Sequence, residues 1–221
     1  MKQLFPGIFE LRKGKRKFLV TENLNPGKTV HIEKLFKENN KEFREWIPGR
    51  SKLAAAILKG ITKTGLNTNS TVLYLGASTG TTVSHISDIV TEGAIFAVEF
   101  APRVARQLVY LSEERPNIAP ILADASKPDE YKDKVPKVDF LFQDIAQKNQ
   151  VEIFLKNIFK FLKQGGIAML AIKARSIDVT KNPKKIFQEV KKDLKTKLDI
   201  IDYRILEPFQ KDHCFFVCRR R

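Results

Sequence analysis

Three acidic side chains each follow directly on an apolar run in this chain of 221 residues. They are Glu99, Asp124 and Asp144, and the intervals between them suit one strand and one helix each. Because the carboxyl ends of parallel strands meet at one edge of a sheet, where α/β proteins bind ligands, we expect these acids to lie together. Carboxylates at that edge can accept hydrogen bonds from sugar hydroxyls and base amino groups. The spacing therefore predicts a nucleoside-binding edge.

A glycine turn, Gly76 to Gly80, precedes these acids at the end of the apolar run Val72–Leu75. A dinucleotide fingerprint needs a further glycine between these two, so that the backbone can approach a pyrophosphate, and Ser78 stands there instead. S-adenosylmethionine carries no phosphate and needs only a tight turn beneath its methionine part, which glycine supplies. The pattern therefore favours S-adenosylmethionine over a dinucleotide, and it predicts a methyltransferase.

The polar groups around this turn each have an expected contact. Thr81 and Thr82 open the next helix, where free backbone N–H groups and the helix dipole receive a carboxylate. Glu99 is expected to accept both ribose hydroxyls, and Asp124 to read the adenine amino group. The alternative is an ordinary strand–turn–helix with solvated acids. Three acids that each close a separate apolar run favour the binding site.

Two lysines, an aspartate and a histidine can converge on the same edge as candidate catalytic groups. A sulfonium is already a good leaving group, so a methyltransferase acting on a hydroxyl must position the acceptor and help to remove its proton. A lysine can accept that proton if burial and neighbours lower its pKa. Asp144 and Lys173 end consecutive strands, His213 begins the last one, and Lys52 starts the helix before the glycine turn. Taken alone, Lys52 could be a solvated surface residue and His213 a structural one.

From residue 70 onward, apolar runs alternate with helical patterns, and we expect an α/β fold. The expected strands are Thr71–Leu75, Ala94–Glu99, Ile118–Ala123, Val138–Gln143, Ile167–Lys173, Asp199–Leu206 and Cys214–Arg219. The expected helices are Thr81–Val90, Ala101–Arg115, Gln150–Leu162, which we expect to stop at Gly165-Gly166, and Pro183–Lys195. Few residues join the last two strands, which requires a hairpin and an antiparallel final strand. A mostly parallel sheet with one antiparallel strand is the Rossmann-like fold of S-adenosylmethionine-dependent methyltransferases.

The first part of the chain has a different pattern, and we divide the chain into residues 1–50 and residues 51–221. Short runs at Ile8–Leu11, Lys17–Val20 and Val30–Ile32, broken by glycine and proline, predict a small β-rich N-terminal subdomain. The charged stretch Phe36–Pro48 is interpreted as a crossover. Ser51 is the expected N-cap of the first helix of the methyltransferase domain.

The charge balance predicts a polyanionic partner. Forty Lys and Arg residues oppose 25 Asp and Glu residues, which gives a net charge of +15, and 43% of the residues are hydrophobic, enough for a full core. A folded enzyme with this excess of positive charge most simply binds nucleic acid. The same excess disfavours a small-molecule methyltransferase. The alternative, a heavily charged surface from a heat-adapted organism, fits the composition but not the imbalance of sign.

Cysteine content and hydropathy suggest a cytoplasmic protein. Cys214 and Cys218 are too far apart along a strand to form a disulfide, and no further metal ligands lie near them. We therefore expect core thiols in a reducing compartment and no bound metal. No apolar run is long enough to span a membrane, and the N-terminus lacks the apolar segment of a secretory signal.

Several segments of the chain share a family pattern: Arg50-Ser51-Lys52-Leu53-Ala54-Ala55, Leu73 to Thr82, Val98-Glu99-Phe100, Asp124-Ala125, Gln143 to Gln147 and Lys211-Asp212-His213. Together they resemble the fibrillarin family in its archaeal form, over essentially the whole chain. We therefore expect no Gly/Arg-rich N-terminal extension of the kind that eukaryotic fibrillarins carry.

The resemblance implies transfer of a methyl group from S-adenosylmethionine to ribose 2′-hydroxyls of rRNA and tRNA. It implies a catalytic set of Lys52, Asp144, Lys173 and His213, and we expect Lys173, with its charge state tuned by Asp144, to accept the proton. The residues expected around the cofactor, glycine turn included, are Gly76, Gly80, Thr81, Thr82, Glu99, Phe100, Asp124, Ala125, Asp144, Ile145, Ala146 and Gln147.

The resemblance also implies partners. Family members act in a box C/D ribonucleoprotein, in which a guide RNA selects the target, a Nop-domain scaffold protein holds the enzyme and a kink-turn-binding ribosomal-type protein anchors the RNA. The chain has no RNA-recognition signature of its own, only diffuse basic residues. Two rival interpretations are a stand-alone RNA methyltransferase and a pure binding module with a degenerate cofactor site.

Overall fold

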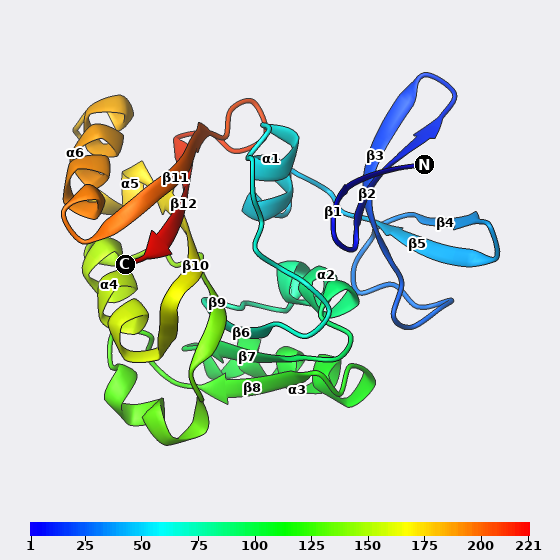
Figure 1. Cartoon of the computed structure of the whole chain (residues 1–221), viewed down its shortest axis with the longest axis horizontal. Coiled ribbons are helices and arrows are strands. Elements are labelled where there is room, and N and C mark those ends of the chain that lie inside the picture. The colour runs from blue at the N-terminus through cyan, green and yellow to red at the C-terminus, as the bar shows by residue number, and fades with distance from the viewer.

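A seven-stranded sheet forms the centre of the computed structural model, which describes residues 1–221 (Figure 1). Its strand order is β11-β12-β10-β9-β6-β7-β8, and only β12 runs against its neighbours. The expected mostly parallel sheet with one antiparallel strand is thereby confirmed. The strands are β6 (Thr71–Leu75), β7 (Ala94–Glu99), β8 (Ile118–Leu122), β9 (Val138–Gln143), β10 (Leu162–Lys173), β11 (Leu198–Ile205) and β12 (His213–Arg220).

Helices cover both faces of this sheet, and each face carries its own apolar core. One core joins the sheet to α1, α2 and α3, and the other joins it to α4 and α6. The α-helices are α1 (Lys52–Leu58), α2 (Thr81–Ile89), α3 (Pro102–Glu114), α4 (Gln150–Phe161), α5 (Ala174–Ile177) and α6 (Pro183–Lys195), and a 3₁₀ helix spans Pro128–Lys134. Ser51 caps α1 as expected, because its Oγ accepts a hydrogen bond from the Ala54 N–H.

The glycine pair after α4 has a different role from the one expected. The helix ends at Phe161, and Leu162 already pairs with Val138 as the first residue of β10. Gly165 and Gly166 lie in the irregular register that follows, where Gly165 has a φ of 74°. The expectation that Gly165-Gly166 stops the helix is therefore wrong: the glycines allow a bulge within β10 instead.

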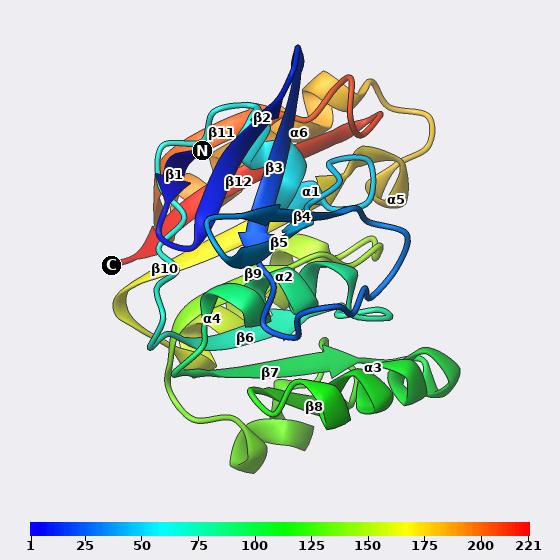
Figure 2. The ribbon, with the colours of Figure 1, turned by 90° about the vertical axis from the view of Figure 1, so that its right-hand side faces the viewer.

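The N-terminal residues form a five-stranded antiparallel sheet in the order β1-β2-β3-β5-β4. Its strands are β1 (Lys2–Phe5), β2 (Ile8–Lys13), β3 (Arg16–Glu22), β4 (Leu35–Glu38) and β5 (Lys41–Glu45). Figures 1 and 2 show this sheet beside the large one, on the side of α1 and α2. The β-rich character expected for this region is confirmed.

Two details of the N-terminal expectation are wrong. The stretch Phe36–Pro48 is not a crossover, because it holds most of a hairpin, β4 to β5, whose turn residues Asn39 and Asn40 both have positive φ. The run Val30–Ile32 is not a strand. The N–H groups of Val30 and His31 donate to the Glu33 carboxylate instead of to a neighbouring strand.

Both cysteines are buried and free, as expected. No helix has the length and apolar character needed to cross a membrane.

Candidate active site

The glycine turn after β6 is packed so closely that a side chain would not fit. Gly76 has a φ of 80°, and a Cβ there would lie 2.4 Å from the Asp144 carbonyl oxygen. The N–H groups of Gly76 and Ala77 both donate to the Val98 carbonyl, at 2.9 and 3.0 Å. Gly80 has a φ of 89°, and a Cβ there would lie 2.3 Å from the Leu111 side chain. The turn therefore requires glycine both for its backbone conformation and for close approach to its neighbours.

A cavity of about 270 Å³ opens beside this turn, at the carboxyl edge of the parallel strands. Its lining includes every residue expected around the cofactor except Gly80, Thr81 and Thr82, which continue from the turn into α2. The lining mixes apolar side chains such as Ile145 and Ile153 with the carboxylates of the strand ends. Such a mixture suits a nucleoside, which has an apolar base and a polar sugar.

The carboxylates at this cavity are held in fixed orientations by backbone N–H groups. Glu99 accepts from Ser78 at 2.8 Å and from Ala101 at 2.9 Å, one bond to each carboxylate oxygen. Asp124 accepts from the Ser126 N–H at 2.8 Å through one oxygen. Since each carboxylate oxygen has more than one lone pair, both side chains keep the capacity to accept hydrogen bonds from a ligand.

The two threonines that begin α2 face different surroundings. Thr82 is buried, and its hydroxyl donates to Ser51 Oγ at 3.0 Å, which ties α2 to the cap of α1. Thr81 is partly buried, and its Oγ1 hydrogen-bonds to Nε2 of His31. The sequence gives no signal for this contact, because nothing near His31 along the chain indicates a contact with residue 81.

The four expected catalytic residues lie on neighbouring elements. The Lys52 ammonium donates to Asp144 Oδ2 at 2.9 Å, and about a fifth to a quarter of each side chain is exposed (26% for Lys52 and 19% for Asp144). Lys173 and His213 face each other in register across β10 and β12. Asp144 therefore forms its ion pair with Lys52, not with Lys173, the lysine that it was expected to tune.

His213 has a defined protonation pattern. Its Nδ1 lies 2.6 Å from the Lys211 carbonyl, which can only accept, so Nδ1 carries the proton. Burial lowers the pKa of His213, and the nearby charges of Lys52 and Lys173 lower it further, while the hydrogen bond to the Lys211 carbonyl and the charge of Asp144 oppose them. The imidazole is therefore neutral at neutral pH, and its Nε2 has a free lone pair.

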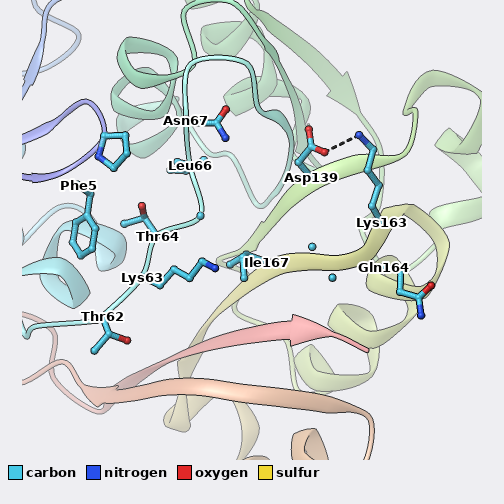
Figure 3. A pocket seen from close by; sticks show the side chains of 14 residues that line it. Phe5, Thr62, Lys63, Thr64, Leu66, Asn67, Asp139, Lys163, Gln164 and Ile167 are labelled. Carbon is cyan, nitrogen blue, oxygen red and sulfur yellow. Dashed lines mark hydrogen bonds and ion pairs between the residues drawn. The ribbon is translucent and has the colours of Figure 1, made fainter.

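A larger hollow, of about 610 Å³, lies at the opposite edge, near the starts of β9 and β10 (Figure 3). There Lys163 and Asp139 form an ion pair at 2.7 Å, with Lys63 nearby. It contains none of the expected site residues. No three His, Cys, Asp or Glu side chains anywhere in the chain are grouped so that they could hold a metal ion.

Comparison with known proteins identifies the family. The family model described as fibrillarin matches residues 1–221, the entire chain. This chain belongs to the fibrillarin family. The resemblance noted from the motifs is thereby confirmed, and it extends to the N-terminal sheet as well as to the methyltransferase fold.

Individual fibrillarin relatives are similar over nearly their whole length. The "fibrillarin-like rRNA/tRNA 2′-O-methyltransferase" of Thermococcus onnurineus (strain NA1) is 50% identical, over 99% of this chain and 98% of the relative. The structure of Aeropyrum pernix fibrillarin with natively bound S-adenosyl-L-methionine superimposes with a TM-score of 0.89 at 43% identity, covering 96% of this chain and 94% of that one. A fibrillarin/Nop5p complex gives a TM-score of 0.90 at 44% identity, covering 98% of each chain.

Proposed function

We propose that this fibrillarin transfers a methyl group from S-adenosylmethionine to ribose 2′-hydroxyls of rRNA and tRNA. The observation that carries the proposal is that one residue, Asp144, belongs to both halves of the site. It lines the cavity beside the glycine turn, and its carboxylate pairs with Lys52 at 2.9 Å. The proposed pocket for the methyl donor is thus next to the proposed catalytic group. The printed names of the relatives support the same reaction.

The cavity residues fit S-adenosylmethionine. We propose that Glu99 accepts the ribose hydroxyls, Asp124 reads the adenine amino group, and Phe100, which is 67% exposed at the cavity, packs against the base. The turn at Gly76 and the first N–H groups of α2 receive the methionine part. Ala125, Ile145, Ala146 and Gln147 complete the lining. The bound cofactor supplies a methyl group on a sulfonium, so the protein must position the acceptor oxygen and take up its proton.

We propose that Lys173 takes up the proton of the ribose hydroxyl. The Lys52 ammonium already donates a hydrogen bond to Asp144. In contrast, no carboxylate lies within ion-pair distance of Lys173. Lys52, held by Asp144, then stabilises negative charge that develops on the acceptor oxygen. His213 orients the hydroxyl, because the lone pair on its neutral Nε2 can accept a hydrogen bond. Asp144 positions Lys52 and keeps the charge of the group balanced.

The partners are part of the proposal. We propose that a Nop-domain scaffold protein holds this chain, a box C/D guide RNA selects the nucleotide, and a kink-turn-binding protein anchors that RNA. The solved fibrillarin/Nop5p complex supports the first partner. The net charge of +15 supports contact with RNA phosphates, to which basic residues such as Lys184, Lys185, Lys191 and Lys192 on α6 can contribute.

Two further assignments accompany this function. We propose a division into residues 1–50 and 51–221; Leu11, Val20 and Phe43 form a small core of their own in support. Ile8 and Leu19 nevertheless join the larger core with α2, so the two parts pack as one body. A cytoplasmic location stays a prediction.

The test is tritiated methyl transfer from S-adenosylmethionine to a guide-matched RNA, with and without the scaffold protein, kink-turn protein and guide RNA. We expect methylation at one nucleotide and only in the full assembly. An RNA with a 2′-deoxyribose at that nucleotide is the matched control and should take up no label. Equal methylation by the chain alone would establish a stand-alone RNA enzyme. No transfer to any RNA, with cofactor binding intact, would reject the proposed acceptor.

A further inference from the structure

His31, in the N-terminal region, contacts the first residue of α2, the helix that follows the glycine turn. Its Nε2 hydrogen-bonds to Oγ1 of Thr81, the first residue of that helix. Gly80, the N-cap, has no side chain with which to cap the helix. Thr81 therefore provides the first side-chain polar group beyond the glycine turn, and His31 is its hydrogen-bond partner.

The loop that carries His31 is fixed by a single carboxylate. Glu33 accepts from the Val30 N–H at 2.7 Å and from the His31 N–H at 2.8 Å. The same carboxylate accepts from the Arg44 guanidinium at 2.7 Å. The Glu33 side chain is only 4% exposed and that of Arg44 is fully buried. The backbone at His31 is therefore held by charge-assisted bonds shielded from water, which are among the stronger hydrogen bonds in proteins.

Arg44 fixes this loop relative to α2 itself. Its guanidinium donates to Ser84 at 3.1 Å and to Asp88 at 2.9 and 3.0 Å, and both acceptors lie on α2. The N-terminal region thus hydrogen-bonds to α2 at successive turns: to Asp88, to Ser84 and, at the first residue of the helix, to Thr81. The contact at Thr81 is the only one of the three made by a side chain that is not fully enclosed.

Either tautomer of His31 can make this hydrogen bond, and the tautomer decides what the Thr81 hydroxyl can still offer a ligand. Burial lowers the pKa of His31, Arg50 and Arg44 lower it too, and Glu33 opposes them, so the ring is neutral at neutral pH. A neutral ring nitrogen either accepts from the Thr81 hydroxyl or donates to it. In both cases one hydrogen bond restrains the Thr81 side chain. When His31 donates, the Thr81 hydroxyl stays free to donate to a carboxylate; when His31 accepts, Oγ1 keeps only lone pairs, which suit an ammonium group.

We infer that His31 is a positioning residue for S-adenosylmethionine: it holds the Thr81 hydroxyl in the orientation that binds the methionine part. The inference rests on the proposed function, because it assigns that part of the cofactor to the start of α2. It gives the N-terminal sheet a role in cofactor affinity, exerted through one side chain. His31 itself need not touch the cofactor.

The test compares affinities for S-adenosylmethionine measured by isothermal titration calorimetry on the full chain. His31→Phe removes the hydrogen bond and should weaken binding by about three- to tenfold, the usual value of one hydrogen bond. His31→Gln restores a donor and an acceptor and should recover most of that loss. Ile32→Ser, at a neighbouring side chain in the same loop that is 76% exposed, is the matched control and should leave affinity unchanged.

A double-mutant cycle separates positioning from a general structural effect. In a Thr81→Val background, which lacks the hydroxyl, His31→Phe should cost no further affinity. In the guided assembly, His31→Phe should raise the KM for S-adenosylmethionine with kcat nearly constant, and its Tm should match that of the parent chain.

Three results would overturn the inference. They are unchanged affinity in His31→Phe, additive losses of affinity in the double-mutant cycle, or a loss of affinity that comes with a matching fall in Tm. The proposed function fails in a different way, since the parent chain itself would then not bind S-adenosylmethionine or would methylate no RNA.

Discussion

Two groups of charged residues in this molecule use the same chemistry for opposite purposes. Beneath the N-terminal sheet, Asp88 accepts from Thr21, from the Leu24 N–H, from Arg44 and from Arg115, and its side chain is fully buried. At the carboxyl edge of the large sheet, the Asp144 carboxylate has one side-chain partner, Lys52, and both are partly exposed. The first group is fully paired and the second is not. Unused hydrogen-bonding capacity, more than charge, marks the group that can act on a ligand.

The largest expected effect tests the buried group. Asp88→Ala removes the only carboxylate partner of buried Arg115 and leaves buried Arg44 paired with Glu33 alone, so we expect it to lower the free energy of unfolding by about 3–5 kcal/mol. Denaturant unfolding monitored by circular dichroism measures the loss. Asp144→Ala is the matched comparison and should cost about 1 kcal/mol or less, because its ion pair is partly exposed. Equal losses from the two substitutions would remove the distinction between the groups.

The next largest effect concerns the catalytic activity of the partly exposed group at the carboxyl edge. Lys173→Ala should lower kcat in the guided assembly by about 100-fold or more, the usual contribution of a positioned base, and should bind S-adenosylmethionine nearly normally. Single-turnover methylation and calorimetry measure the two quantities separately. Lys163→Ala, which removes a lysine paired with Asp139 at the opposite edge, is the control and should retain full turnover. Full turnover in Lys173→Ala would assign the proton to another group.

A smaller effect concerns the proposed cofactor pocket. Asp124→Ala removes the acceptor expected to read the adenine amino group and should weaken S-adenosylmethionine binding by about tenfold with the fold intact. Asp133→Ala, in the 3₁₀ helix outside the pocket, is a suitable control for loss of a charge. Unchanged affinity in Asp124→Ala would remove the adenine assignment.

The same contrast explains what could be predicted from the sequence. The large sheet could be predicted because its strands carry their own apolar runs, and the pocket because the strands β6 to β8 end at or near an acid or glycine, as at Gly76, Glu99 and Asp124. Local signals of this kind do not depend on the rest of the chain. The hairpin of β4 and β5 was missed because charged residues outnumber the apolar ones in these two strands, although Asn39-Asn40 is a recognisable turn signal.

The contacts between distant segments could not be predicted. Arg44 and Arg115 look like surface charges along the sequence, and only the packing of β5 and α3 against α2 buries them on Asp88. His31 reaches Thr81 for the same reason. Convergence of Lys52 on Asp144 was expected from topology, but topology does not decide which lysine the carboxylate pairs with.

The smallest expected effect is the pH dependence of stability. It compares His85, which hydrogen-bonds to Thr21 in the buried group around Asp88, with His213 at the carboxyl edge of the large sheet. Burial, followed by the charges of Arg44, Arg115 and His31, holds the pKa of His85 well below its usual value. Between the folded pKa and about 6.5 the unfolded chain binds a proton that the folded chain does not, so stability falls as pH drops through that range.

His85→Gln removes this titration, because glutamine stays neutral. Between pH 7.5 and 5.5 the variant should lose about 1 kcal/mol less unfolding free energy than the parent, measured by denaturant unfolding at both pH values. Carboxylates titrate alike in both proteins, so the difference isolates His85. His213→Gln should change the slope less, because His213 is the less deeply buried of the two and keeps a free nitrogen toward the site. A larger change from His213 than from His85 would mean that the edge group, and not the buried one, governs acid stability.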